Sequence, residues 1–347
     1  MKILILGANG FIGHSLTARI LADTDWEVFG MDVCADRIEE HLGNRRFHFL
    51  DGDISINHEW IEYHVKKCDV VLPLVAIATP MSYVREPLRV FELDFEQNLR
   101  IVRHAVDYGT RLVFPSTSEV YGMCADPILS EDQSLLVMGP IHKQRWIYAC
   151  SKQLLDRVIY AYGQERGLRF TLFRPFNWVG PKLDNISSAL EGSSRVVTQF
   201  LGHLMRDEPV RLVEGGAQRR CITYISDGVE ALMRILADER GKADGQILNL
   251  GNPDNDCSIR DLAELLVDVL AEFPGFEGLR ETAVLEKVSS EEYYGSGYQD
   301  IQSRVPDITK AREILGWEPV VGLREALRRT VAYYAERGEP PRASDAA

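Results

Sequence analysis

The stretch ILILGANGFIG, residues 3–13, decides the fold class of this chain. Four apolar residues, typical of a buried strand, lead directly into three glycines, Gly7, Gly10 and Gly13, and a helix is expected to follow to about residue 22. Such a turn lets the backbone approach a diphosphate, whose charge the helix N-terminus favours. Glycines also occur in ordinary tight turns, so the motif indicates a dinucleotide site only if the following segments agree.

The second expected strand, residues 27–31, provides that agreement. It ends at Asp32, about 20 residues after the glycines, where an acid binds the ribose hydroxyls of a dinucleotide. A carboxylate there repels a 2′-phosphate, and no arginine or lysine follows it directly, although Arg37 lies nearby. The sequence therefore favours NAD over NADP.

Further apolar runs predict the remainder of an α/β, doubly wound parallel sheet. Strands are expected over residues 47–50, 70–74 and 112–115, with helices over 59–67 and 92–107. Asp53, after the third strand, could accept a hydrogen bond from an adenine amino group or cap the helix that begins near His58. The small, mostly non-polar segment 76–80 suits contact with a dinucleotide.

Composition narrows the class of partner. The net charge of −13 disfavours nucleic acid, which needs a clustered basic face. No apolar run approaches the length of a signal peptide core or a membrane span. The six cysteines form no C-x-x-C pair, and the eight histidines lack ligand spacing. We therefore expect a cytoplasmic protein with reduced cysteines, no metal and no membrane partner.

Two polar groups of residues suggest chemistry. The stretch STSEVYG, residues 116–122, follows a buried strand, where open α/β sheets bind ligands, although it could simply be a capped strand exit. Tyr148 and Lys152 are four apart and share a helix face, as a surface pair also would. Beside a bound cationic nicotinamide, the ammonium would lower the pKa of the phenol and make it a general base. Ser118 could then hold a substrate hydroxyl.

The ordered set of glycine motif, Asp32, Ser118 and Tyr148-x-x-x-Lys152 resembles the extended short-chain dehydrogenase/reductase family over nearly the whole chain. The resemblance implies a Rossmann domain that binds NAD and a smaller C-terminal α/β lobe for a nucleotide sugar. It also implies a homodimer, paired through the helices near 92–107 and 147–165. The implied division gives residues 1–177 and about 221–250 to the cofactor domain, about 178–220 and 251–337 to the substrate lobe, and 338–347 to a flexible tail.

Within that family, UDP-glucuronate decarboxylases carry a single acid directly after the catalytic serine. This chain resembles them, because Glu119 follows Ser118. Hexose 4-epimerases usually lack an acid there, and 4,6-dehydratases carry an Asp-Glu pair. The segments 75–80, 145–146, 176–178 and 294–300 also resemble bacterial UDP-4-keto-pentose/UDP-xylose synthases, including the decarboxylase domain of the bifunctional polymyxin-resistance enzyme. Plant UDP-apiose/UDP-xylose synthases are similar too, but they carry cysteines in place of Ala78 and Ser118.

The resemblance assigns roles residue by residue. The implied catalytic residues are Ser118, Glu119 as proton acceptor, Tyr148, Lys152, and Arg304 as proton donor. The implied NAD contacts are Gly7, Asn9, Gly10, Phe11, Ile12, Gly13, Asp32, Asp53, Ile54, Tyr148 and Lys152. The implied UDP-glucuronate contacts are Ala78, Tyr83, Thr117, Ser118, Arg145, Asn177, Arg211, Arg219, Arg220 and Tyr298. From the residues alone, Arg304 could be a surface arginine and residues 213–220 a hairpin turn, although two arginines near a glycine pair suit a diphosphate.

The implied activity is NAD-dependent decarboxylation of UDP-glucuronate through a 4-keto intermediate. The product would be UDP-4-keto-pentose if NADH leaves and UDP-xylose if the hydride returns. Three alternatives stay open: another nucleotide-sugar epimerase or dehydratase, a UDP-apiose/UDP-xylose synthase, and a Rossmann redox sensor that binds NAD without chemistry.

Overall fold

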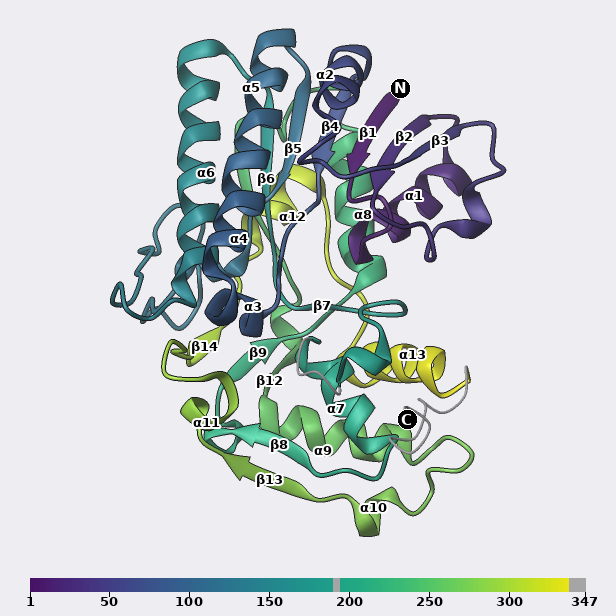
Figure 1. Cartoon of the computed structure of the whole chain (residues 1–347), viewed down its shortest axis with the longest axis vertical. Coiled ribbons are helices and arrows are strands. Elements are labelled where there is room, and N and C mark those ends of the chain that lie inside the picture. Colours follow the sequence, from purple (N-terminus) through teal and green to yellow (C-terminus); the bar gives the residue numbers. More distant parts are fainter. Residues whose placement is uncertain (190–193, 337–347) are drawn as a thin grey trace.

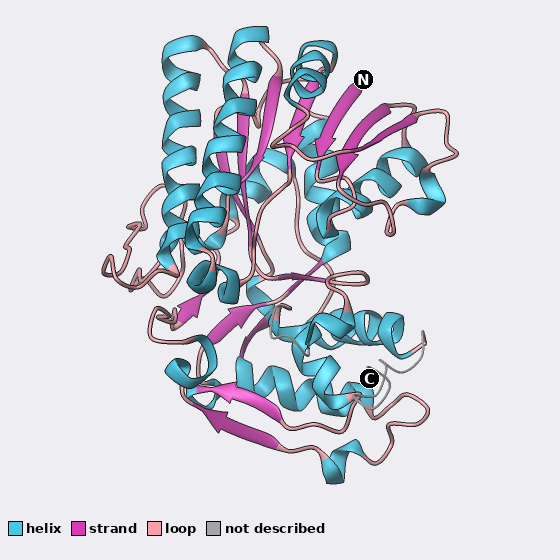
Figure 2. Ribbon diagram, viewed as in Figure 1, coloured by secondary structure: helices cyan, strands magenta, loops and turns pink. Residues whose placement is uncertain are grey.

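A seven-stranded parallel sheet, in the order β11-β6-β5-β4-β1-β2-β3, forms the upper part of the molecule in Figures 1 and 2. The computed structural model describes residues 1–189 and 194–336, so the predicted tail at 338–347 lies outside the described residues. The strands are β1 (Lys2–Leu6), β2 (Glu27–Asp32), β3 (Phe47–Asp51), β4 (Val70–Pro73), β5 (Arg111–Pro115), β6 (Phe170–Pro175) and β11 (Gln246–Leu250). This is the Rossmann-type doubly wound sheet that the sequence predicts.

Alternation along β1 explains why both faces of the sheet are covered. Ile3 and Ile5 belong to the core beneath α1 and α8, whereas Leu4 and Leu6 belong to the core beneath α2, α5 and α6. The covering helices are α1 (Phe11–Asp23), α2 (His58–Lys67), α5 (Asn98–Tyr108), α6 (Trp146–Arg166), α8 (Ile225–Leu236) and α12 (Thr309–Leu315). Short helices α3 (Pro80–Arg85) and α4 (Pro87–Phe91) follow β4.

A second group of elements lies below the carboxyl ends of these strands (Figure 1). Its strands are β7 (Trp178–Val179), β8 (Val210–Val213), β9 (Arg219–Cys221), β10 (Thr223–Tyr224), β12 (Asp256–Ser258), β13 (Leu285–Val288) and β14 (Ser303–Arg304). Its helices are α7 (Val196–Leu204), α9 (Ile259–Leu270), α10 (Leu279–Thr282), α11 (Ser290–Tyr294) and α13 (Leu323–Ala335). Ser258 caps α9 in a reciprocal bond with Asp261. The residue limits of the two predicted domains stay a prediction.

Two local alternatives are wrong, and one expected helix is present with a different first turn. Residues 213–220 are not a hairpin, because β8 pairs with β13 while β9 pairs with β12 and β14. Asp53 does not cap α2; its carboxylate accepts bonds from the N–H and the hydroxyl of Ser55 instead. The helix expected over 92–107 begins with a π-helical turn, Glu92–Gln97. Over the described part of the chain, no helix has the length and apolar character that crossing a membrane requires.

Candidate active site

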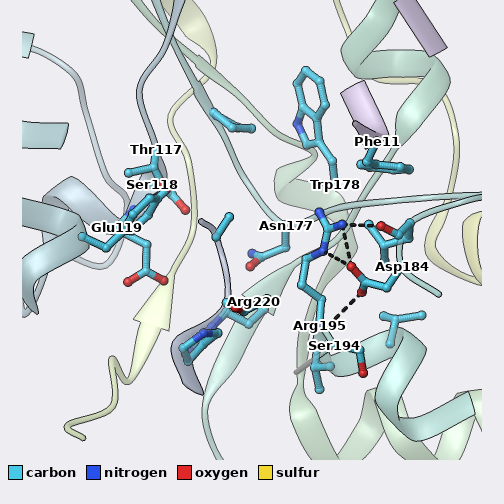
Figure 3. Close-up of a pocket in the computed structure, with 18 of the residues that line it drawn as sticks. Phe11, Thr117, Ser118, Glu119, Asn177, Trp178, Asp184, Ser194, Arg195 and Arg220 are labelled. Carbon is cyan, nitrogen blue, oxygen red and sulfur yellow. Dashed lines mark hydrogen bonds and ion pairs between the residues drawn. The ribbon is translucent and has the colours of Figure 1, made fainter. Parts of the chain in front are cut away.

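A cavity of about 610 Å³ lies where the carboxyl ends of the parallel strands meet the lower elements (Figure 3). This is the edge at which open α/β sheets bind ligands. It brings together most of the predicted site: Gly7, Gly10, Phe11, Ile12, Gly13, Ala78, Tyr83, Thr117, Ser118, Glu119, Arg145, Tyr148, Lys152, Asn177, Arg211, Arg220, Tyr298 and Arg304. It is not lined by Asn9, Asp32, Asp53, Ile54 or Arg219.

The glycine loop has the geometry of a diphosphate cradle. Gly7 has a φ of +90°, and a Cβ on Gly13 would lie 2.1 Å from the carbonyl oxygen of Gly7. Side chains are therefore excluded where α1 meets the loop, so a diphosphate could approach the backbone at the N-terminus of α1. Asp32 lies just outside the cavity and accepts a bond from the N–H of Asn9 at 2.9 Å. These residues fit a dinucleotide, with Asp32 at the ribose end.

Tyr148 and Lys152 are buried on one face of α6, so they are not an exposed pair. The aromatic ring of Tyr148 stacks on that of Tyr83, with 4.7 Å between centroids and 5° between planes. Lys152 Nζ donates to the carbonyl oxygen of Pro115 at 3.1 Å and lies 3.9 Å from Oδ1 of Asp94. The ammonium thus lies between the end of β5 and an acid that the sequence did not single out.

The protein's own groups raise the pKa of Tyr148. Burial is the largest cause, and the charges of Asp94 and Glu119 add to it, while a bond with Thr117 and the charge of Arg195 oppose it. The pKa of Tyr148 is thus raised overall in the protein without cofactor, and the predicted lowering, which applies beside a bound nicotinamide, stays a prediction. A positive charge brought by a bound oxidised nicotinamide would act in the lowering direction.

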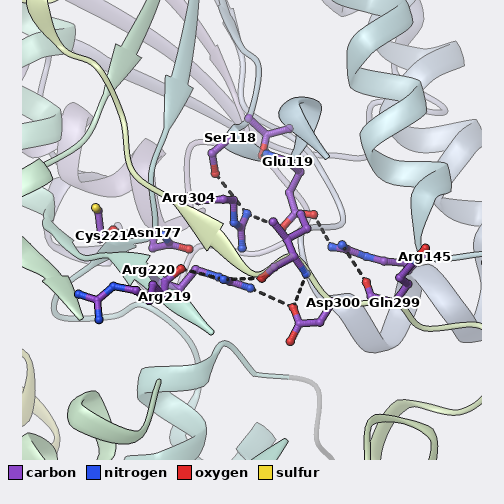
Figure 4. A network of polar contacts seen from close by, with 12 residues as sticks. Ser118, Glu119, Arg145, Asn177, Arg219, Arg220, Cys221, Gln299, Asp300 and Arg304 are labelled. Carbon is purple, nitrogen blue, oxygen red and sulfur yellow. Dashed lines mark hydrogen bonds and ion pairs between the residues drawn. The ribbon is translucent and has the colours of Figure 1, made fainter. Parts of the chain in front are cut away.

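Glu119 is the centre of a charged network (Figure 4). One carboxylate oxygen accepts from Arg304 at 2.6 Å and the other forms an ion pair with Arg145. Burial alone would raise the pKa of Glu119, but the charges of Arg145, Arg304 and Arg220 outweigh it and lower the pKa to about 2. Arg304 also donates to Oγ of Ser118 at 3.3 Å. Arg304 is thus a buried partner of the Ser118–Glu119 pair and not a surface arginine.

Two neighbouring arginines of β9 separate because successive strand residues point to opposite faces. Arg220 points into the cavity, where it pairs with Asp300 at 3.0 Å and donates to the carbonyl oxygen of Ile301 at 2.8 Å. Arg219 points away from that network in Figure 4 and pairs with Asp256 at 2.8 Å, half exposed. The structure therefore does not bring Arg219 to the cavity with the other predicted substrate contacts.

Sequence reasoning missed two charged residues at the site. Arg195 lines the cavity, lies 5.3 Å from the ring of Phe11 and pairs with Asp184 at 2.7 Å (Figure 3). Asp94 lies behind the wall next to Lys152. No sequence signal singled out Asp94, because Glu92 and Glu96 lie in the same stretch. Among the described residues, no cluster of three His, Cys, Asp or Glu side chains is placed to hold a metal.

Comparison with known proteins identifies the class. The model of the NAD dependent epimerase/dehydratase family matches residues 3–251. The chain belongs to this family: it is an enzyme that acts on nucleotide sugars, and its cofactor is NAD.

Solved structures agree with that class. The chain is similar to the PbgP3 protein from Burkholderia pseudomallei, with 56% identity over 96% of each chain and a TM-score of 0.88. It is also similar to UDP-glucose 4-epimerase from Thermotoga maritima, crystallised with UDP-glucose, with 25% identity over 97% of this chain and 99% of that one and a TM-score of 0.79. The fold is shared with a UDP-glucuronic acid 4-epimerase mutant from Bacillus cereus in complex with NAD, with 21% identity, coverage of 97% and 100%, and a TM-score of 0.81.

Proposed function

We propose that this enzyme decarboxylates UDP-glucuronate with NAD and forms a UDP-4-keto-pentose. The observation that carries the proposal is the pairing of one acid with two arginines beside the hydroxyl of Ser118. Glu119 holds Arg304 through one oxygen and Arg145 through the other. This network supplies a fixed, ionised acid and cationic donors next to the Tyr148–Lys152 pair, which suits a substrate that carries its own carboxylate.

The first step is oxidation at C4″ of the sugar. NAD⁺, when bound, would supply the acceptor for the hydride that leaves C4″. Tyr148 takes the proton of the C4″ hydroxyl, and Ser118 and Thr117 hold that hydroxyl in line with the phenol. Lys152 contributes a fixed positive charge at this end of the cavity. Oxidation places a ketone β to the C6″ carboxylate.

The second step is loss of CO₂ from that β-keto acid. The C5″–C6″ bond breaks, and its electron pair is delocalised into the 4-keto group as an enolate. Glu119, with its pKa lowered to about 2, stays ionised and keeps the two arginines in place. A guanidinium gives up a proton with difficulty, so a water molecule polarised by Arg304 protonates C5″. The hydroxide left behind is neutralised by the proton that Tyr148 took in the first step. Release of NADH leaves the ketone, whereas return of the hydride to C4″ gives UDP-xylose.

Binding of the nucleotide end is assigned to the lower wall of the cavity. Arg211 and Arg220 suit a diphosphate, and Tyr298, whose hydroxyl bonds Asp300 at 3.2 Å, closes the same side. Ala78, Tyr83 and Asn177 complete the proposed substrate contacts. Asn177 has a φ of 42°, in the left-handed region, so its place in the wall is set against local backbone preference.

A single assay tests the proposal. The protein is incubated with UDP-glucuronate and NAD⁺, and NADH absorbance is followed together with evolved CO₂. Equal amounts of CO₂ and NADH would support release of the 4-keto-pentose, and CO₂ without NADH would assign UDP-xylose. No CO₂ would contradict the decarboxylase and leave an epimerase, a dehydratase or a redox sensor.

We also infer a homodimer of cytoplasmic location. Helices α5 and α6 lie together at one side of the sheet in Figure 1, and their outer surface exposes Tyr108, Leu154 and Tyr160. All six cysteines lie in the described part of the chain and are free, as reducing conditions would leave them. Light scattering of the purified protein, with Leu154→Glu as the interface variant, distinguishes a dimer from a monomer.

A further inference from the structure

A buried acid lies directly behind the wall of the cavity. Asp94 has no exposed surface, and its Oδ1 lies 3.9 Å from Nζ of Lys152. This oxygen accepts no hydrogen bond from the described residues, so the ammonium is the charge that it faces. The other carboxylate oxygen accepts a bond from the N–H of Ile77 at 3.0 Å. One carboxylate thus contacts both the lysine and the segment 76–80 of the cavity wall.

The π-helical turn explains how an acid comes to face inward here. The wider turn Glu92–Gln97 shifts the side chains that follow relative to an α-helix. Asn98 stabilises it, because its amide donates to the carbonyl oxygens of Leu93 and Asp94, both at 3.2 Å. Glu92 and Glu96 on the same turn are exposed. The turn therefore presents one of its three acids to the active site and the other two to solvent.

The pKa values of Asp94 and Lys152 depend on each other. Burial is the largest effect on both: it lowers the pKa of Lys152 and raises the pKa of Asp94 to about 6, while each partner opposes the shift of the other. Tyr83 and Tyr148 also face Asp94. Asp156 is the other acid that faces Lys152, but it is occupied by Ser116 at 2.6 Å and by Arg174 at 3.4 Å.

We propose that Asp94 is a positioning residue that keeps the ammonium of Lys152 charged, one turn of α6 from Tyr148, and ties it through Ile77 to the substrate-facing wall. Asp94 itself lines no part of the cavity and acts through Lys152. The inference rests on the role of the Tyr148–Lys152 pair in the proposed function, and it holds for any oxidation at C4″, with or without loss of CO₂.

The titration of Lys152 tests this directly, without substrate. Protein labelled with ¹³C at the lysine ε-carbon reports each ammonium by NMR, and the resonance missing from Lys152→Arg identifies the relevant one. Asp94→Asn keeps an oxygen for the Ile77 N–H but removes the charge, so the midpoint of Lys152 should fall by one pH unit or more. Glu96→Gln, an exposed acid on the same turn, is the matched control and should titrate as the wild type does. An unchanged midpoint in Asp94→Asn would overturn the proposal.

Two further measurements keep the test decisive. In the wild type, protonation of Asp94 should give the Lys152 resonance a second inflection near pH 6, which needs no variant to fold; its absence would also contradict the pairing. Calorimetry gives the affinity for NAD⁺ as a function of pH. In Asp94→Asn this affinity should fall at a lower pH than in the wild type. In Asp94→Glu, which retains the charge, the pH at which the affinity falls should shift less. If the wild type released no CO₂ from UDP-glucuronate while the Lys152 midpoint and the NAD⁺ affinity shifted as described, that result would contradict the proposed reaction alone and would leave the role of Asp94 in place.

Discussion

The pKa values of the two acids at this site, Glu119 and Asp94, shift in opposite directions although both side chains lie largely inside the protein. The pKa of Glu119 is lowered to about 2, whereas that of Asp94 is raised to about 6. Glu119 is bonded to Arg145 and Arg304, while Asp94 faces only Lys152, at 3.9 Å. Burial pushes both pKa values up, so the number and closeness of the cations decide the sign. Glu119 is a permanent charge and Asp94 a titratable one.

The difference assigns different tasks to the two regions. The Glu119 network holds arginines in fixed directions around the substrate carboxylate, and a guanidinium suits this because it is planar and always charged. In our proposal Asp94 keeps the ammonium of Lys152 charged one helical turn from Tyr148, and this support is needed because burial lowers the pKa of a lysine. The two tasks fall to different residues, but both acids act on the phenol of Tyr148, because the charges of Asp94 and Glu119 each raise its pKa.

Tyr148→Phe should have the largest effect, because Tyr148 stands between the two acids and both raise its pKa. Loss of a general base costs about 10²–10⁴-fold in kcat. NADH formation from UDP-glucuronate measures this, and urea unfolding serves as the control that shows whether the variant folds as the wild type does. Turnover within about threefold of the wild type would remove the phenol from the reaction.

Glu119→Gln and Arg304→Ala should come next, because both break the network at Ser118. We expect CO₂ release to fall on the order of 10²-fold in each, with NAD⁺ affinity little changed. Because Asp94 and Lys152 lie outside this network, the Lys152 titration should also be unaffected. Wild-type rates of CO₂ release in both variants would exclude the network from the mechanism.

Acid should destabilise the protein partly through Glu119. Its folded-state pKa of about 2 lies below the value of about 4.3 in an unfolded chain, so its contribution is present above pH 4.3 and is lost as the pH falls towards 2. The shift corresponds to about 3 kcal/mol. Urea unfolding of the wild type and of Glu119→Gln at pH 7 and pH 3 measures it.

The stability difference between those two proteins should be larger at pH 7 than at pH 3. At pH 7 the variant leaves Arg145 and Arg304 without their acid, which costs about 3–5 kcal/mol for a buried pair. The same difference at both pH values would mean that Glu119 is not ionised by its arginines.

Arg219→Ala should have the smallest effect and Arg220→Ala a marked one, although the two residues are adjacent. Arg219 forms a half-exposed pair with Asp256, and such pairs contribute about 0–1 kcal/mol. Arg220 lies in the cavity and bonds Asp300. The KM for UDP-glucuronate should rise only in Arg220→Ala. Equal increases in both would place Arg219 at the substrate.

Much of the fold could be predicted from the sequence because its signals are local. The apolar run at residues 3–6, the glycines that follow and the spacing of Tyr148 and Lys152 each require only a few neighbouring residues. The assembly of Glu119 with Arg145 and Arg304 spans 185 residues between acid and distal arginine. Only the resemblance to a family singled out Arg304.

Other parts of the site could not be read from the sequence for identifiable reasons. Arg219 and Arg220 point in opposite directions because successive residues of a strand alternate. This could be inferred only once both residues were known to lie in strand β9 and not in a hairpin turn. Asp94 was hidden because an α-helical pattern over 92–107 does not indicate a π-helical turn. From the sequence alone, the phenol of Tyr148 is the expected partner of Lys152, whereas the structure places the Lys152 ammonium next to Asp94.

The fate of the sugar carboxylate tests the central claim most directly. Uniformly ¹³C-labelled UDP-glucuronate is incubated with the protein and NAD⁺ and followed by ¹³C NMR. The account predicts that the C6″ signal disappears as labelled CO₂ or bicarbonate appears, together with a five-carbon sugar product. Retention of the C6″ carboxylate in the product, with an altered configuration at C4″, would contradict it and assign an epimerase.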